Sequence, residues 1–110
     1  MANKTNITEL SALLTQPYAH LELGQVDDHA VYVLLAKGRF PLHRHTQDEM
    51  YIVMEGSLTI SFHNSADLHL EKGDATVVRA YTTHSPHSDE GAIVLMVKPK
   101  EMFARGGDME

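Results

Sequence analysis

The sequence predicts an all-β domain, either a sandwich or a barrel, and two observations support this prediction. Short runs of apolar and β-branched residues follow one another from Ala19 to Lys98, and turn residues such as Glu55-Gly56-Ser57 separate them. Many short strands with such regular spacing are typical of β-sandwiches and β-barrels. At 110 residues the chain has room for one hydrophobic core, so we expect a single domain over residues 1–110, with its barrel core at 19–98.

A short segment precedes the predicted strands. Ile7–Leu14 places apolar residues at helical spacing, with Thr8 as a possible cap, and it ends before Pro17. This segment predicts a helical turn or an extended arm. The strands are then predicted at Ala19–Val26, Ala30–Lys37, Met50–Met54, Leu58–Phe62, Leu68–Leu70, Ala75–Arg79 and Ala92–Lys98.

The apolar patterning of these strands predicts how each is buried. Leu58–Phe62 alternates apolar and polar residues, which indicates one buried face and one exposed face. Tyr32–Ala36 and Ala92–Val97 are nearly all apolar, so we expect burial on both faces, within the barrel or against a second subunit. Asp89–Gly91 predicts a turn before the last strand. Because apolar runs and strand edges need cover, we expect a homodimer.

The composition excludes several functional classes. The formal net charge is -6, and the 9 Lys and Arg residues are scattered, which argues against a nucleic-acid partner. Apolar runs fall short of the roughly 20 residues that span a membrane, and Met1–Ala12 does not look like a signal peptide, so we expect a cytoplasmic protein without a membrane partner. With 0 cysteines, any metal site must use imidazole and carboxylate ligands.

Three histidines and one glutamate form a candidate metal site. His43 and His45 are two residues apart, so on a strand their imidazoles face the same side. Glu49 shares this side, whether the intervening residues turn or run straight. His84 lies beyond the predicted strand Ala75–Arg79. His87, three residues later, could be mistaken for the ligand or could carry protons beside it, but we interpret it as an exposed loop histidine. The alternative is a set of polar residues satisfied by water and backbone at a barrel mouth.

Two stretches of this sequence resemble the conserved motifs of the cupin superfamily. Gly38-Arg39-Phe40-Pro41-Leu42-His43-Arg44-His45-Thr46-Gln47-Asp48-Glu49, followed by Gly56, resembles the first motif. Gly73-Asp74-Ala75-Thr76-Val77-Val78-Arg79-Ala80-Tyr81-Thr82-Thr83-His84 resembles the second. The chain departs from the motifs at Gly38, which is one residue closer to His43 than usual, and at Arg79, Tyr81 and Ser88. None of these departures removes a metal ligand.

The resemblance implies a small, single-domain cupin, whose fold is the double-stranded β-helix or jelly-roll barrel. It also implies that His43, His45, Glu49 and His84 hold one divalent transition metal ion per chain. Imidazole and carboxylate ligands suit manganese, iron, nickel, cobalt, zinc and copper, so the ligands do not identify the metal. Cupins that resemble this chain are commonly dimers.

Four further residues are candidates for a substrate pocket. Tyr51 has the same strand parity as Glu49, so it should point into the barrel, where its hydroxyl could orient a substrate or its ring could simply fill the core. Arg39, Arg79 and Tyr81 flank the predicted mouth. An arginine there could pair with a ligand carboxylate or phosphate, and a solvated rim charge is the alternative.

Two functional hypotheses follow. The first is a metal-dependent enzyme that acts on a small organic molecule, as an oxygenase, isomerase or decarboxylase. The second is a non-catalytic module that binds a small metabolite in the barrel. The sequence does not decide between them.

Overall fold

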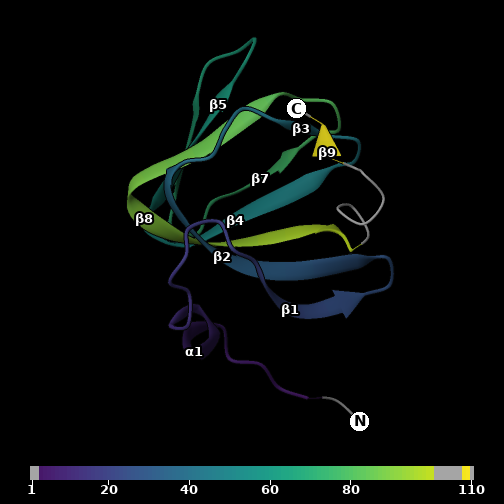
Figure 1. The fold of residues 1–110 in the computed structure, drawn as a ribbon, viewed down its shortest axis with the longest axis vertical. Coiled ribbons are helices and arrows are strands. Elements are labelled where there is room, and N and C mark those ends of the chain that lie inside the picture. The colour runs from purple at the N-terminus through teal and green to yellow at the C-terminus, as the bar shows by residue number, and fades with distance from the viewer. Residues whose placement is uncertain (1–2, 101–107, 110) are drawn as a thin grey trace.

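The computed structural model describes residues 3–100 and the backbone of Asp108 and Met109. One short helix precedes the strands, which form an open-ended barrel (Figure 1). The elements are α1 (Ile7–Ser11), β1 (Leu21–Val26), β2 (His29–Arg39), β3 (Arg44–His45), β4 (Glu49–Glu55), β5 (Ser57–Phe62), β6 (Leu68–Glu71), β7 (Ala75–Val78), β8 (His84–Pro99) and β9 (Asp108–Met109). The all-β prediction is therefore confirmed. The predicted strand ends lie within two residues of the observed ones except at the start of β8, which begins eight residues earlier than predicted, and β3 and β9 were not predicted.

The long strand β8 connects both halves of the barrel. It pairs antiparallel with β2 from His29↔Pro99 to Arg39↔His87. Its second half also pairs with β4, and β4 in turn pairs with β7. Its first half pairs with β5, and β5 in turn pairs with β6. Figure 1 shows this strand curving around the molecule from green to yellow. The curvature lets one strand supply side chains to both ends of the barrel.

The structure overturns one sequence prediction at this point. Asp89–Gly91, predicted as a turn, lies inside β8. The bend that its turn residues favour is accommodated within the strand, where Gly91 has a φ of +99° and the pairing with β2 shifts register between Ala36 and Gly38. A local change of register lets a strand bend without ending.

The barrel interior follows the alternation expected for strands. On β4, Tyr51 and Val53 are buried while Ile52 and Met54 are only half-buried, so Tyr51 points into the barrel as its strand parity predicts. The core cluster comprises Leu34, Ala36, Tyr51, Val53, Leu58, Ile60, Leu70, Val78, Ala92, Val94 and Met96. The apolar runs on β2 and β8 are buried on the inner face, and on the outer face burial ranges from complete at Val33 to partial at Val97.

The N-terminal segment is a helix of 5 residues, shorter than the predicted range. Its cap is Asn6, not Thr8, because Asn6 has an extended backbone and its side-chain oxygen accepts the Glu9 N–H at 2.9 Å. Thr8 instead lies within the first turn. Within the described part of the chain, no helix is long and apolar enough to cross a membrane.

Two glycines have nearly the same backbone conformation in different surroundings. Gly56, between β4 and β5, has φ +77°, and a Cβ added there would meet the Gly91 carbonyl oxygen at 2.6 Å and Ala92 Cα at 3.1 Å. Gly38 has φ +76°, and an added Cβ would have nothing within 4 Å. The turn after β4 thus requires glycine for space as well as for backbone conformation.

Candidate metal centre

The four predicted ligands meet at one end of the barrel. His43 precedes β3, His45 lies in β3, Glu49 is the first residue of β4 and His84 is the first residue of β8. The backbones of His43 and His84 exchange two hydrogen bonds, of 3.0 and 2.9 Å, which join the segment before β3 to the start of β8. The Tyr81 N–H donates to the His45 carbonyl at 2.8 Å, so the loop before β8 also holds β3.

The side chains of these residues converge closely enough to share one ion. One potential ligand atom from each of the four lies within 4.8 Å of every other. Nε2 of His84 is 3.0 Å from Glu49 Oε1, and Nε2 of His45 is 3.3 Å from Glu49 Oε2. Glu49 and His84 are only 2% and 1% exposed. A cluster of three imidazoles and a carboxylate this deeply buried needs a positive charge to compensate the carboxylate.

Backbone carbonyls set the tautomers of two histidines. Nδ1 of His43 lies 2.8 Å from the Pro41 carbonyl oxygen, and Nδ1 of His84 lies 2.7 Å from that of Thr82. Each Nδ1 therefore carries a hydrogen, and in a neutral ring the Nε2 lone pair is the metal-binding atom. At His84 this lone pair would face Glu49 Oε1 at 3.0 Å. Because both atoms are then acceptors, a proton or a metal ion must lie between them.

The remaining oxygen of Glu49 also indicates a cation site. Oε2 is buried and has no hydrogen-bond partner by geometry among the described residues, although His45 Nε2 lies 3.3 Å from it. Burial by itself raises the pKa of Glu49, but the imidazoles of His45 and His84 outweigh burial and hold the pKa well below its usual range. Glu49 is therefore an ionised carboxylate with an unsatisfied oxygen, which fits a metal ligand.

The pKa of His43 also favours metal coordination. Burial lowers the pKa of His43, and the neighbouring His84 and His45 lower it further, which outweighs the opposing effects of the Pro41 carbonyl and Glu49. The neutral imidazole that results is the form that binds metals. The donor set thus fits a divalent transition metal.

Tyr51 contacts two of these residues from the barrel interior. Its hydroxyl donates to Glu49 Oε1 at 3.1 Å and lies 3.3 Å from His84 Nε2. Burial, followed by the negative charge of Glu49, raises the pKa of Tyr51 well above its usual value. The hydroxyl keeps its proton, so it can orient the carboxylate from behind.

The fold and the site together agree with a known family. The sequence model described as Cupin domain matches residues 30–98, which include all four clustered residues and most of the barrel. The chain belongs to the cupin family. The barrel expected from the two motifs is therefore confirmed.

Individual proteins are similar over most of this chain. An uncharacterized protein, YdbB of Bacillus subtilis (strain 168), is 26% identical over 102 residues, which cover 92% of this chain and 90% of that protein. The crystal structure of a cupin-2 domain containing protein from Shewanella frigidimarina has a TM-score of 0.83 and 26% identity, and covers 87% of this chain and 94% of that one. A hydroquinone 1,2-dioxygenase, PnpCD, solved with Cd²⁺ and 4-hydroxybenzonitrile, has a TM-score of 0.75 at 20% identity, with 86% and 71% covered.

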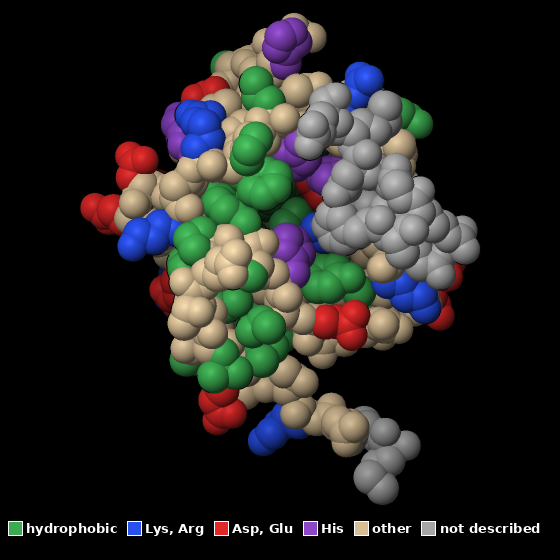
Figure 2. Space-filling model, in the orientation of Figure 1, with side chains coloured by type: hydrophobic (Ala, Val, Ile, Leu, Met, Phe, Trp, Pro, Cys, Tyr) green, Lys and Arg blue, Asp and Glu red, His purple; other side chains and the backbone are tan. Residues whose placement is uncertain are grey.

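A cavity of about 320 Å³ extends from the clustered residues of this cupin into the barrel. Its polar side is formed by His43, His45, Glu49 and Tyr51, and further lining residues are Tyr18, His20, Leu34, Ala36, Phe40, Leu58, Pro86, Val94, Met96 and Lys98. In the space-filling view, hydrophobic side chains surround histidines in the middle of this face (Figure 2). A mostly apolar cavity with few polar groups is typical of small-molecule sites.

Ten lining residues of this cupin were absent from the predicted site, and four of them have aromatic or polar side chains: Tyr18, His20, Phe40 and Lys98. Tyr18 donates to the Gly38 carbonyl at 2.7 Å, and burial raises its pKa to about 12. The signal for Lys98 was available, because Lys98 lies on the same side of its strand as Val94 and Met96. Tyr18 and Phe40 lie outside the predicted strands, where alternation gives no side-chain direction. His20 lies within the predicted strand Ala19–Val26 but precedes the observed β1, which begins at Leu21.

The predicted rim residues lie away from the cavity. Arg39 is exposed and donates to Ser85 Oγ at 3.1 Å, and Arg79 is paired with Asp48 Oδ2 at 3.1 Å. Tyr81 is 60% exposed. Of the four predicted pocket residues, only Tyr51 lines the cavity of this cupin.

His87, the alternative to His84, also lies away from the clustered residues. His87 points to Ser61, whose Oγ is 3.1 Å from its Nε2, and it is not part of the cluster. The structure therefore brings His84, not His87, to the candidate ligands. His87 lies on the opposite side of β8 from His84, three residues further on.

Proposed function

We propose that this cupin binds one divalent transition metal ion through His43, His45, Glu49 and His84, and that it is a metal-dependent enzyme acting on a small organic molecule. The observation that carries the proposal is the buried Glu49 carboxylate, whose Oε2 has no hydrogen-bond partner among the described residues and faces imidazole nitrogens at the end of an apolar cavity. Such an arrangement is costly without a cation and suitable with one.

The chemistry at such a site divides between the ion and the protein. A metal held by three imidazoles and one carboxylate supplies a Lewis-acid or redox centre with open coordination positions. The Pro41 and Thr82 carbonyls fix two ligand rings, and the Tyr51 hydroxyl holds the carboxylate. The apolar walls restrict water and leave room for a substrate beside the ligands.

The proposed reaction is that of an oxygenase, an isomerase or a decarboxylase. A hydroquinone 1,2-dioxygenase shares the fold, which supports the barrel as a scaffold for oxygen chemistry. The metal is manganese, iron, nickel, cobalt, zinc or copper, because all of them accept this donor set.

The alternative is a non-catalytic module that binds a small metabolite in the same cavity. The largely apolar lining favours it, since such a cavity can bind a ligand without any reaction. Turnover distinguishes the two. Metal-loaded protein that converts no member of a panel of small acids, sugars and phenols, yet binds one of them equally well without metal, would support the alternative.

The ligand assignment is tested by elemental analysis of the purified protein and of the double variant His45→Ala/Glu49→Ala. We expect wild-type protein to hold close to one equivalent of a transition metal and the double variant to hold little. The matched control is His69→Ala/Glu71→Ala, which removes the same two residue types from exposed positions on β6. Equal metal content in the wild type and the site variant would refute the assignment.

We also propose that the protein is a cytoplasmic homodimer with one domain over residues 1–110. The outward side of β2 and β8 supports the dimer, because Leu35, Ile93 and Val97 are apolar and only half-buried in the single chain. A second subunit would cover such a surface. Light scattering that gave the mass of one chain at micromolar concentration would refute the dimer.

A further inference from the structure

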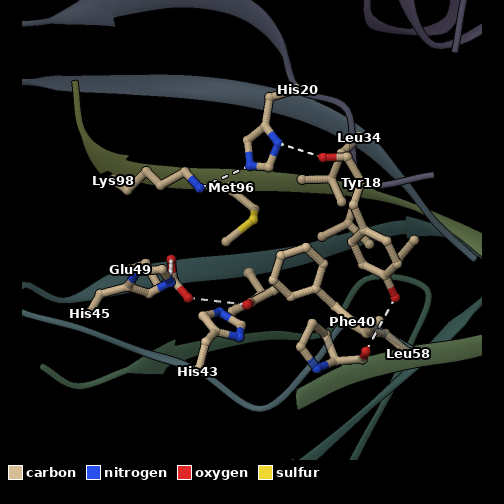
Figure 3. A pocket seen from close by; sticks show the side chains of 14 residues that line it. Tyr18, His20, Leu34, Phe40, His43, His45, Glu49, Leu58, Met96 and Lys98 are labelled. Atoms are coloured by element: carbon tan, nitrogen blue, oxygen red, sulfur yellow. Dashed lines mark hydrogen bonds and ion pairs between the residues drawn. The ribbon is translucent and has the colours of Figure 1, made fainter. Parts of the chain in front are cut away.

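The two ends of the cavity differ in chemistry. Figure 3 shows the candidate ligand Glu49 at one end and Tyr18, Phe40 and Leu58 at the other, where Leu34 also lies. Leu34 and Leu58 are only 2% and 1% exposed and belong to the hydrophobic core. We call Tyr18, Leu34, Phe40 and Leu58 the apolar end of the cavity. A ligand group that reaches this end is removed from water.

Several polar side chains that line the cavity are bonded to other protein groups. The Tyr18 hydroxyl donates to a backbone carbonyl at 2.7 Å, and the Tyr51 hydroxyl donates to Glu49 Oε1 at 3.1 Å. Nζ of Lys98 lies 2.9 Å from His20 Nε2. These contacts commit both hydroxyl protons and the lysine–histidine pair to the protein. A polar group of a ligand therefore has its partners at the clustered metal-ligand residues.

Three rings connect the apolar end to the candidate ligands. The ring of Phe40 contacts those of Tyr18 and His43, with centroids 5.1 and 4.9 Å apart. Phe40 lines the cavity and is 36% exposed, so the protein leaves part of its ring uncovered. Met96 also lines the cavity, and a thioether favours contact with aromatic rings. A flat ring fits this wall, because aromatic rings pack well in offset or edge-to-face arrangements.

The size of the cavity limits the ligand to about one ring. Its volume of about 320 Å³ lies at the low end of the roughly 300–1,000 Å³ that small-molecule pockets occupy. A ring placed along the aromatic wall has one edge toward His43 and the opposite edge toward the apolar end. The first edge can carry a polar group. On the second edge a polar group would be buried among hydrocarbon groups, which is costly.

We propose that the cavity binds a small single-ring molecule of the alkylphenol type, with its polar edge at the clustered residues and its apolar edge at Leu34 and Leu58. Phe40 is the specificity-determining residue, because the ring of the ligand packs on it. This inference names the substrate class of the proposed function, and for any reaction it rests on that function. The apolar end lies away from Glu49, so the preference for an apolar edge does not require the metal. Sugars, which are polar on every edge, fall outside this class.

The test is isothermal titration calorimetry with 4-ethylphenol and 4-(hydroxymethyl)phenol, which have nearly the same shape and differ by a hydroxyl in place of a methyl group. Either orientation of the second compound places one hydroxyl at the apolar end. We expect 4-ethylphenol to bind about 10- to 100-fold more tightly, which is the discrimination that an apolar pocket achieves against an added hydroxyl. Chelator-treated protein and protein loaded with Zn²⁺ should show the same preference, because a bound ion acts on the phenol hydroxyl that both compounds share.

The variant Phe40→Ala tests the aromatic wall. It removes the ring and should weaken the binding of 4-ethylphenol about tenfold, since a buried aromatic contact contributes about that factor. The control Tyr81→Ala removes an aromatic ring that is 60% exposed and outside the cavity, and it should bind 4-ethylphenol as the wild type does. Phe40→Leu retains an apolar side chain without the ring and should bind with intermediate affinity.

Three results would overturn the proposal. One is equal affinity for the two compounds in the wild-type protein, or no binding of either. Another is an affinity for 4-ethylphenol that Phe40→Ala leaves unchanged. The third is a preference seen only with Zn²⁺, since the apolar end would then not be its source. If Phe40→Ala does not fold, Phe40→Leu takes its place, and the wild-type comparison decides the ligand class without any variant.

The outcomes also separate this proposal from the function on which it rests. Elemental analysis of the wild-type protein reports the metal site independently of either phenol. Protein that holds its metal but does not prefer 4-ethylphenol would retain the metal-site proposal and lose the substrate class. Protein that holds no metal but prefers 4-ethylphenol through Phe40 would give the reverse result.

Discussion

Replacing Gly56 by alanine should destabilise the protein far more than the same change at Gly38. The two glycines have φ +77° and +76°, so both substitutions place alanine in the same unfavourable backbone region. That strain costs about 1–2 kcal/mol, offset in part by the smaller entropy of the unfolded chain. Gly38→Ala adds no contact, and we expect a loss of about 1 kcal/mol.

At Gly56 the added methyl group also meets the backbone. The Gly91 carbonyl oxygen would lie 2.6 Å from the new Cβ, and that backbone belongs to a paired strand that cannot move aside easily. Forcing extra volume into a packed site costs a further 1–3 kcal/mol or so, which gives about 2–4 kcal/mol for Gly56→Ala. Urea unfolding followed by circular dichroism, at one fixed protein concentration, measures both variants. Equal losses for the two would refute the steric reasoning.

Three further predictions concern the site. Tyr51→Phe should weaken metal binding roughly tenfold or more, because the hydroxyl orients Glu49, whereas Tyr81→Phe at an exposed position should not; competition with a metal-binding dye measures both. In metal-free protein, Glu49→Gln should flatten the dependence of stability on pH. The pKa of Glu49 is lower in the folded than in the unfolded state, so its ionised carboxylate stabilises the fold at pH values above the unfolded-state pKa, and this contribution is lost as the pH falls. Unchanged urea midpoints from pH 6 to pH 3 in the wild type would contradict this. Metal at 100 times its dissociation constant should add about 2.7 kcal/mol of stability, which a chelator should reverse in a thermal melt.

The metal ligands could be predicted because strand alternation is a local rule. His43, His45 and Glu49 lie within one short stretch, so their positions in sequence determine the side on which they lie. The choice between His84 and His87 also required knowing where β8 begins. Had β8 been extended back through Asp89–Gly91, alternation from Val94 would have selected His84, but the turn residues in that segment concealed the continuous strand.

The cavity wall opposite the ligands could be predicted only in part. Arg39, Arg79 and Tyr81 are close to the ligands in sequence, but hydrogen bonds and backbone conformation turn them away: Arg79 pairs with Asp48, and Tyr81 has φ +64°. His20 reaches the cavity through a long-range contact with Lys98, 78 positions away in the chain. Pairings of this kind depend on the register of the sheet, which no local pattern specifies.

The two backbone hydrogen bonds between His43 and His84 give the metal centre a role in local unfolding. Their amides protect each other, so neither can exchange its hydrogen with solvent until the segment before β3 separates from the start of β8. A metal ion bound by the same two side chains would have to be released in that opening. The free energy of metal binding would therefore appear as slower hydrogen exchange at these two amides, and the mouth of the barrel would open least often when the site is filled.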